Sequence, residues 1–207
     1  MQQIAQTHLA ALVKENGNKM TTGFLGTRPL LPALSASGHH DLAGVLMQQH
    51  EYPSWGYEVD NGATTIWERW NSYVKGSGVH EPSMNSFSHY AFGAVCEWMM
   101  ADLAGIDRAA PGFDRVRIAP RPTGTITRAA ASMETRHGRL ACSWKIDAGK
   151  FLAEIVVPTN TTADVTLPVK GEILEGGAKA GGRPGIREIA GNQLTLGSGT
   201  YQFSAAF

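Results

Sequence analysis

The run Thr64-Thr65-Ile66-Trp67-Glu68-Arg69-Trp70 places one carboxylate between two tryptophans. Around it, the chain between Tyr52 and Trp98 holds ten of its seventeen aromatic residues and four of its five tryptophans. Aromatic faces stack on the C–H faces of sugars, and the acid–base chemistry of glycoside cleavage uses Glu or Asp. This combination predicts a carbohydrate-processing site. Aromatic residues also gather in helical cores, so their number alone leaves a core role open.

The residues next to this carboxylate are typical of loops over a pocket. Residues 52–57 and 60–65 are rich in turn formers and polar side chains and have no regular apolar period. A lone glutamate is usually a solvated surface residue. Indoles on both sides of Glu68 would partly desolvate its carboxylate, which favours a role in proton transfer.

Charge and cysteine content exclude several classes of function. Eighteen basic and eighteen acidic residues cancel and form no run of one sign, so the sequence has no footprint for nucleic acid or for a membrane surface. A neutral glycan or small molecule fits better as a partner. Cys96 and Cys142 lack the spacing of zinc ligands or of a disulfide framework, and each is expected to be a small buried hydrophobe.

We expect neither a metal nor a cofactor. The run His39-His40-Asp41 resembles a metal site at first sight, but adjacent histidines point in different directions on a helix, so we interpret it as a helix start. The N-terminal residues 1–6 lack the basic and apolar regions of a signal peptide, and the sequence has no segment of about 20 apolar residues. These features predict a soluble chain of undetermined compartment.

The first half of the sequence has helical periodicity and the second half has alternating periodicity. Helices are predicted over residues 4–13, 29–38, 40–49 and 86–103, the second with Pro29 at its first position. From Phe113 onward short alternating runs predict strands, with a hairpin across residues 147–150, and the whole region predicts a β-sandwich. We therefore predict an α+β chain with domains at residues 1–110 and 111–207.

The helical half is difficult to explain as a complete domain. Its helices are separated by about 35 residues without a regular pattern, and long irregular stretches are uncommon inside compact folds. We therefore expect this half to be part of a larger helical domain.

Five motifs together resemble a known family, the bacterial α-L-rhamnosidases. They occur in the family's order at residues 21–27, 38–43, 52–57, 62–70 and 84–95. The resemblance continues more weakly at Pro111-Gly112-Phe113 and at residues 118–122, which are similar to the family's junction with its last β-domain. It implies the last helices of an (α/α)6-barrel catalytic domain followed by an antiparallel β-sandwich, the C-terminal third of a longer enzyme.

The resemblance also implies a mechanism and its residues. Family members are inverting glycosidases that release terminal α-L-rhamnose, and their Thr-Thr-x-Trp-Glu motif supplies the general base, here Glu68. The general acid would come from an upstream part of the barrel that is absent from this sequence. The family's matching histidine, here His89, contacts a rhamnose hydroxyl. The preceding residue is Ser88, where many members have Asn, so its contact is left open.

Three further residues are candidates for sugar binding. Trp55 is the best candidate for an aromatic wall beside the sugar, and Trp67 is a second aromatic candidate, although either could belong to the core. Asp60 could bind a hydroxyl or could serve as a helix cap or turn residue. A histidine at the position of His89 is, without the resemblance, more often a core or helix-end residue.

Two other functions remain open. A glycan-binding protein could keep the aromatic pocket and, without the acid, turn nothing over. A fragment with no function of its own is the third alternative. Taken alone, the chain is expected to show no turnover and to self-associate, because an open half-barrel would expose the apolar stripes of its helices, including Leu30, Leu34, Val45 and Val95.

Overall fold

The computed structural model describes the backbone of residues 2–207 and the side chains from Ile4 onward. Met1, which belongs to the segment that predicts the absence of a signal peptide, lies outside the described residues. The chain divides into two compact units, Met1–Trp98 and Met99–Phe207. The predicted domains at residues 1–110 and 111–207 remain a prediction. None of the helices in the described part of the chain combines the length and apolar character needed to cross a bilayer.

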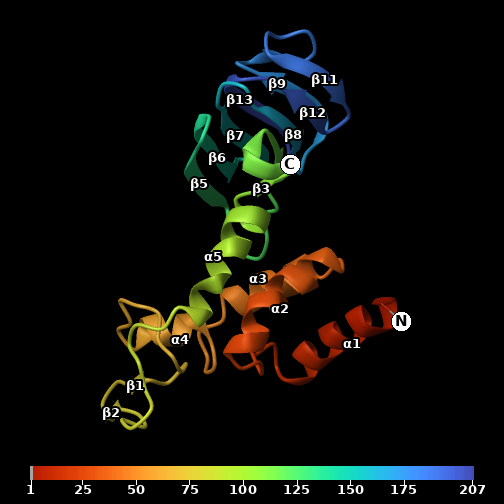
Figure 1. Cartoon of the computed structure of the whole chain (residues 1–207). Coiled ribbons are helices and arrows are strands. Elements are labelled where there is room, and N and C mark those ends of the chain that lie inside the picture. The colour runs from red at the N-terminus through yellow and green to blue at the C-terminus, as the bar shows by residue number, and fades with distance from the viewer. Residues whose placement is uncertain (1) are drawn as a thin grey trace. The chain divides into compact units, whose positions relative to one another are not determined.

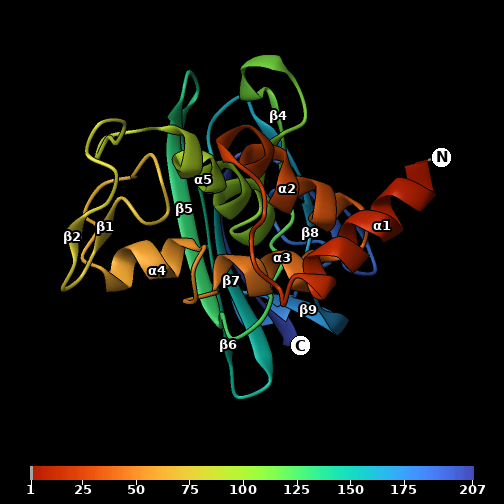
Figure 2. The same cartoon turned by 90° about the horizontal axis from the view of Figure 1, so that it is seen from below.

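The first unit consists of short helices and irregular segments (Figure 1). Its elements are α1 (Gln2–Glu15), α2 (Phe24–Ala36), α3 (His40–Met47), α4 (Trp55–Asp60), β1 (Tyr73–Val74), β2 (Gly78–Val79), the 3₁₀ turn η1 (Ala91–Ala94) and α5 (Val95–Trp98). Figure 2 shows the small β1–β2 hairpin beside α4, and the amide of Lys75 donates to the Asn61 side chain at 2.8 Å between them.

The core of this unit forms where α2 packs against α3, η1 and α5. Leu34, Leu46 and Trp98 are almost completely buried there. The indole N–H of Trp98 donates to Ser35 Oγ at 2.7 Å, and this oxygen lies 2.9 Å from His40 Nδ1. Since His40 is the first residue of α3, the predicted helix start at the histidine pair is confirmed, and one of the two rings belongs to a polar contact in the core.

The predicted start of α2 at Pro29 was wrong. The helix begins at Phe24, because Thr27 donates two hydrogen bonds to the Gly23 carbonyl. One comes from the Thr27 amide at 3.1 Å and the other from the Thr27 hydroxyl at 3.0 Å. These contacts close the first turn upstream, so Pro29 and Pro32 lie inside the helix. The C-terminal limit near Gly38 agrees with the prediction, and Gly38 has the left-handed backbone (φ 86°) that ends many helices.

The continuous helix predicted over residues 86–103 was also wrong. Residues 86–90 are irregular, and the helical run starts only at Ala91 with a 3₁₀ turn. Phe87 and Tyr90 had helical spacing, but they are 38% and 88% exposed. The cause is that residues 86–89 bond instead to the segment around Glu68, as described below.

Two expectations about exposure need correction. Leu30 and Leu34 were expected to face water, but they are only 5% and 0% exposed because α3, η1 and α5 cover this side of α2. Val45 is 41% exposed, as expected for an uncovered stripe. Both cysteines were expected to be buried; Cys142 is buried in a sheet, whereas Cys96 is exposed.

The second unit opens with the π-helical turn η2 (Met99–Leu103) and is then a β-sandwich. Its elements are β3 (Ile106–Arg108), the 3₁₀ turn η3 (Pro111–Phe113), β4 (Arg115–Ile118), β5 (Arg128–Thr135), β6 (Gly138–Asp147), β7 (Lys150–Val157), β8 (Thr162–Thr166), β9 (Lys170–Glu175), β10 (Ala178–Lys179), β11 (Ile186–Ala190), β12 (Gln193–Leu196) and β13 (Gly199–Ala206).

The sandwich has one six-stranded and one five-stranded sheet, in the orders β10-β9-β13-β7-β6-β5 and β11-β12-β8-β4-β3. Among the described strands, every pairing is antiparallel except that of β4 with β8, which is parallel. Alternate residues of the strands are buried; on β6 they are Leu140, Cys142 and Trp144. The predicted sandwich is therefore confirmed, with a parallel pair that the sequence did not indicate.

The β6–β7 hairpin matches its prediction residue for residue. Asp147 pairs with Lys150, and Ala148 and Gly149 between them have positive φ angles of 47° and 74°. Two central residues with positive φ give a turn whose twist suits paired strands. Figure 2 shows the long neighbouring ribbons of β5, β6 and β7.

Candidate active site

Two irregular segments pair through their backbones and hold Glu68 and His89 together. The amide of Glu68 donates to the Ser86 carbonyl at 2.9 Å, and the amide of His89 donates to the Ile66 carbonyl at 2.9 Å. The Thr65 hydroxyl also donates a hydrogen bond to the Phe87 carbonyl of the other segment. The motif with the candidate base and the motif with the candidate sugar-binding histidine therefore form one local structure.

Aromatic rings pack along this structure. Trp70 stacks on Phe92, with ring centroids 3.7 Å apart, and Trp55 meets Trp70 edge to face at 5.3 Å. The indole N–H of Trp55 donates to the Phe92 carbonyl at 3.0 Å. Trp67 lies edge to face against the Phe87 ring, with centroids 5.6 Å apart. Trp67 and Trp70 are 4% and 7% exposed, so these two tryptophans belong to the core of the loop.

A second aromatic group has open faces. The His89 ring lies 5.6 Å from that of Tyr90, almost parallel to it, and 5.6 Å from the ring of Phe24 at the start of α2. Phe24 is 46% exposed and Tyr90 is 88% exposed, whereas His89 is half-buried. The first motif thus contacts the fifth at this imidazole, and the fifth motif pairs with the fourth through the backbone.

The other two predicted residues lie on α4, a helix that the sequence did not predict. Trp55 is its first residue and is half-buried. Asp60 is its last residue, and its Oδ2 lies 2.8 Å from His50 Nδ1. The carboxylate of Asp60 is 54% exposed, so it contacts a neighbouring side chain without leaving solvent. The sugar-binding roles of both residues remain predictions.

The sequence-based interpretation missed Glu58. This carboxyl is 3% exposed and accepts a hydrogen bond from the backbone N–H of Trp67, the residue before Glu68. Burial raises the pKa of Glu58 to about 8, although the Trp67 hydrogen bond acts in the opposite direction. The available signal was its spacing: Glu58 follows Trp55 by three residues, which puts both on one face of a helix capped by Ser54.

This arrangement can perform proton transfer beside a ligand with apolar and hydroxyl faces. Glu68 is half-buried, so its carboxylate is partly shielded but still reachable by water. The imidazole of His89 and the exposed ring of Tyr90 lie on the neighbouring segment, and the exposed ring of Phe24 contacts the imidazole from the start of α2. Within the described residues, no three His, Cys, Asp or Glu side chains gather in a way that could hold a metal ion.

A hollow in the second unit has no comparable chemistry. It is a groove of about 790 Å³ along β5, β6, β7 and β13. Trp144 and Phe203 border it, but their side chains are 3% and 2% exposed and belong to the sandwich core. The alternate residues that face the groove include Ser143, Leu152 and Gln202 and no aromatic side chain, so the groove offers no aromatic platform for a sugar.

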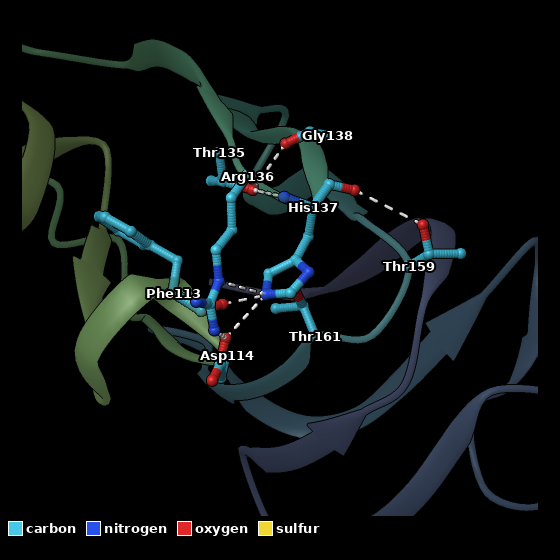
Figure 3. Close-up of polar contacts among 8 residues, drawn as sticks. All are labelled: Phe113, Asp114, Thr135, Arg136, His137, Gly138, Thr159 and Thr161. Carbon is cyan, nitrogen blue, oxygen red and sulfur yellow. Dashed lines mark hydrogen bonds and ion pairs between the residues drawn. The ribbon is translucent and has the colours of Figure 1, made fainter.

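A polar cluster around Asp114 also lies in the second unit (Figure 3). His137 Nε2 lies 2.7 Å from Asp114 Oδ1, and the Arg136 guanidinium donates to the same oxygen. Three hydroxyls nearby donate to backbone carbonyls instead of to the imidazole; they belong to Thr135, Thr159 and Thr161. The cluster therefore lacks an activated nucleophile, and it ties the β5–β6 turn to the start of β4.

Asp114→Asn is expected to lower the melting temperature of the second unit at neutral pH. Hydrogen bonds from His137 and Arg136 hold the pKa of Asp114 below its ordinary value. A lowered carboxyl pKa stabilises the fold above the unfolded pKa, and this stabilisation is lost as the pH falls through the folded pKa. The difference from wild type should thus shrink as the pH falls below the unfolded pKa and through the lowered folded pKa.

Thermal unfolding followed by far-UV circular dichroism would measure this difference. Glu134→Gln, a substitution of an exposed acid on the neighbouring strand β5, serves as the control. A difference between Asp114→Asn and wild type that stays constant down to the acid limit would contradict the assigned hydrogen bonds.

Two family models match the chain. Residues 1–103 match the bacterial alpha-L-rhamnosidase 6 hairpin glycosidase domain, and residues 105–182 match the bacterial alpha-L-rhamnosidase C-terminal domain. Both descriptions name domains of the bacterial alpha-L-rhamnosidases, and the two matches meet between the helical and the strand-rich parts of the chain.

Curated relatives agree with this match. An alpha-L-rhamnosidase from Streptomyces avermitilis is 45% identical over 168 residues, which cover 81% of this chain and 16% of the relative. One from Formosa agariphila is 43% identical over 164 residues, which cover 79% of this chain and 18% of the relative. The chain thus spans less than a fifth of the length of either protein.

Solved structures have the same fold. The crystal structure of the Streptomyces avermitilis alpha-L-rhamnosidase complexed with L-rhamnose matches with a TM-score of 0.87 at 40% identity, over 98% of this chain and 20% of that chain. The native enzyme from Aspergillus terreus matches with a TM-score of 0.84 at 33% identity, over 98% of this chain and 21% of that chain.

Proposed function

The chain belongs to the bacterial α-L-rhamnosidase family, and from this premise we propose that it supplies the catalytic base and part of the sugar site for inverting hydrolysis of terminal α-L-rhamnosides. The observation that carries the proposal is the backbone pairing that joins the segment of Glu68 to that of His89. It brings the segment of a half-buried glutamate beside the segment of a histidine whose ring is flanked by the exposed rings of Phe24 and Tyr90. The relatives that the chain matches are named for the same activity.

In the proposed mechanism Glu68 activates water. Inversion needs one acid that protonates the leaving oxygen and one carboxylate, about 6.5–9.5 Å away, that takes a proton from water on the opposite face of the sugar. Glu68 accepts that proton as the water oxygen bonds to the anomeric carbon and the glycosidic bond breaks. We assign the acid to no residue of this chain, which spans 16% of the length of the Streptomyces relative.

The remaining predicted residues bind or frame the sugar in this proposal. His89 contacts a hydroxyl, and Trp55 gives an apolar wall against which the methyl group and C–H faces of rhamnose can pack. Trp67 has little open surface, so it contributes mainly by fixing the loop on which Glu68 lies. Asp60 borders the site from the end of α4 and would reach a hydroxyl only if it left His50.

The direct test uses a full-length enzyme that contains this chain and an aryl α-L-rhamnoside. We expect hydrolysis, with β-L-rhamnose as the first anomer seen by proton NMR before mutarotation. Release of the α-anomer first would overturn inversion, and hydrolysis of another glycoside in place of rhamnosides would overturn the substrate. Rhamnose binding without turnover would favour a glycan-binding protein.

His89→Ala is expected to weaken rhamnose binding more than it affects the fold. A lost hydrogen bond to a buried ligand hydroxyl costs about 1–3 kcal/mol, which is about 5-fold to 150-fold in Kd. Isothermal titration calorimetry with L-rhamnose and a thermal melt would separate the two effects. Unchanged affinity together with a much lower melting temperature would instead make His89 a structural residue, held by its neighbours Phe24 and Tyr90.

A further inference from the structure

Glu58 is a buried carboxyl directly behind the loop of Glu68. It is 3% exposed, and it accepts the backbone N–H of Trp67, the residue before Glu68. Its Oε1 is one of the few buried side-chain atoms in the described part of the chain that has no hydrogen-bond partner. A buried acid with one oxygen unpartnered is costly to a fold, and the acid at this position is therefore unexpected from stability alone.

The helix that carries Glu58 is firmly placed. The N-cap Ser54 is fully buried, and its Oγ accepts the amide of Tyr57 at 3.0 Å. Gly56 lies so close to the Gln49 carbonyl and the His50 ring that a Cβ at this position would collide with them. A six-residue helix would otherwise be marginal, so these contacts make α4 a rigid support.

This support contacts the loop of Glu68 on both sides of the glutamate. Glu58 holds the amide of Trp67 before it, and the ring of Trp55 lies 5.3 Å from the ring of Trp70 after it. On the other edge of the loop, the amide of Glu68 itself is bonded to Ser86. The direction of the Glu68 side chain is therefore set by a backbone that α4 and the 86–89 segment clamp between them.

We propose that Glu58 is a positioning residue for Glu68, and that its hydrogen bond to the Trp67 backbone fixes the loop in the geometry needed for base catalysis. This inference rests on the proposed function, because it needs Glu68 to be the base. Misplacement of a catalytic group by about 1 Å can lower a rate about 100-fold, so one backbone contact adjacent to the base can have a large effect.

The ionisation of Glu58 agrees with this role. Burial raises its pKa to about 8, so the carboxyl is neutral around pH 7 and adds no second negative charge behind the base. A neutral amide of the same shape should therefore replace it: the Gln carbonyl can accept the same Trp67 N–H. A leucine fills similar space but has no acceptor.

The test compares Glu58→Leu and Glu58→Gln in a full-length enzyme that contains this chain. We expect Glu58→Leu to lower kcat about 10-fold to 100-fold with little change in KM, and Glu58→Gln to keep kcat within about threefold. Glu51→Leu and Glu51→Gln, at an exposed glutamate shortly before α4, are the matched controls. A kcat for Glu58→Leu equal to that of Glu51→Leu, or an equal loss with Gln and Leu at position 58, would overturn the inference.

Two further measurements keep the outcomes separate. Glu68→Gln in the same enzyme tests the proposed function. Full activity of Glu68→Gln would reject Glu68 as the base. Loss of activity in Glu68→Gln without loss in Glu58→Leu would reject only the positioning role of Glu58. If Glu58→Leu does not fold, amide exchange of Trp67 in the 207-residue chain decides. We expect slow exchange in wild type and in Glu58→Gln, and exchange as fast as in an exposed loop would overturn the hydrogen bond.

Discussion

Glu68→Gln is expected to lower kcat on aryl α-L-rhamnosides by about 10²–10⁴ in a full-length enzyme that contains this chain, with little change in rhamnose affinity. Gln keeps the shape and hydrogen bonds of the side chain but cannot accept a proton from water. The amide of Glu68 is held by Ser86 and its loop by Trp67 and Trp70, so the substitution should leave the loop in place and remove only the base.

A substrate with an activated leaving group distinguishes the loss of the general base from the loss of the general acid. A 2,4-dinitrophenyl rhamnoside needs no protonation of its leaving oxygen, so a missing acid would be tolerated on this substrate, whereas a missing base would not. With Glu68→Ala, added azide should restore turnover by attacking the anomeric carbon directly and should give the β-L-rhamnosyl azide. Near-wild-type activity of Glu68→Gln, or full recovery on the activated substrate, would exclude Glu68 as the base.

The parts of the fold that the sequence predicted well are those whose pattern repeats several times. In the β6–β7 hairpin, buried and less buried residues alternate over both strands around the turn at Ala148 and Gly149. In α3 the apolar residues repeat over two turns, and Leu42 and Leu46 are buried. Such repeats show which side of an element faces a core, and they can be seen within the sequence of that element alone.

The errors occurred where contacts distant in sequence decide the backbone. Phe87 and Tyr90 have helical spacing, yet their segment bonds to Ile66 and Glu68, about twenty residues earlier in the chain. The helix α4 has only six residues, which is too short for a period to be visible among its aromatic and charged residues. Its existence depends on the Ser54 cap and on close packing at Gly56, which a linear pattern does not show.

The candidate site also depends on contacts between residues that are distant in sequence. Glu68 and His89 are predicted as site residues because the family resemblance carries their motifs, and no periodicity could have joined two residues that are twenty-one positions apart. Glu58 was missed because burial, rather than residue type, distinguishes it from the other glutamates. Its neighbours in sequence give no indication that its partner is a backbone amide of the loop that follows.

The final prediction concerns Glu58→Gln and pH. Because the pKa of Glu58 is about 8 in the fold and 4.5 in the unfolded chain, the folded state keeps a proton that the unfolded state releases between these values. The wild-type chain should therefore lose stability as the pH rises from about 4.5 to about 8, by an amount on the order of a few kcal/mol, and no further above it. Glu58→Gln has no such proton, so its stability advantage over wild type should grow through this window.

Urea unfolding of the 207-residue chain at several pH values would measure this, with tryptophan fluorescence as the probe, because four of the five tryptophans lie in the first unit. Glu51→Gln is a suitable control, since the hydrogen bond from Lys19 lowers the pKa of Glu51 and puts its titration on the acid side of the window. That control should run parallel to wild type above about pH 4.5. Parallel curves for wild type and Glu58→Gln would mean that the Glu58 carboxyl reaches water, and the loop of Glu68 would then lack the buried, neutral support inferred for it.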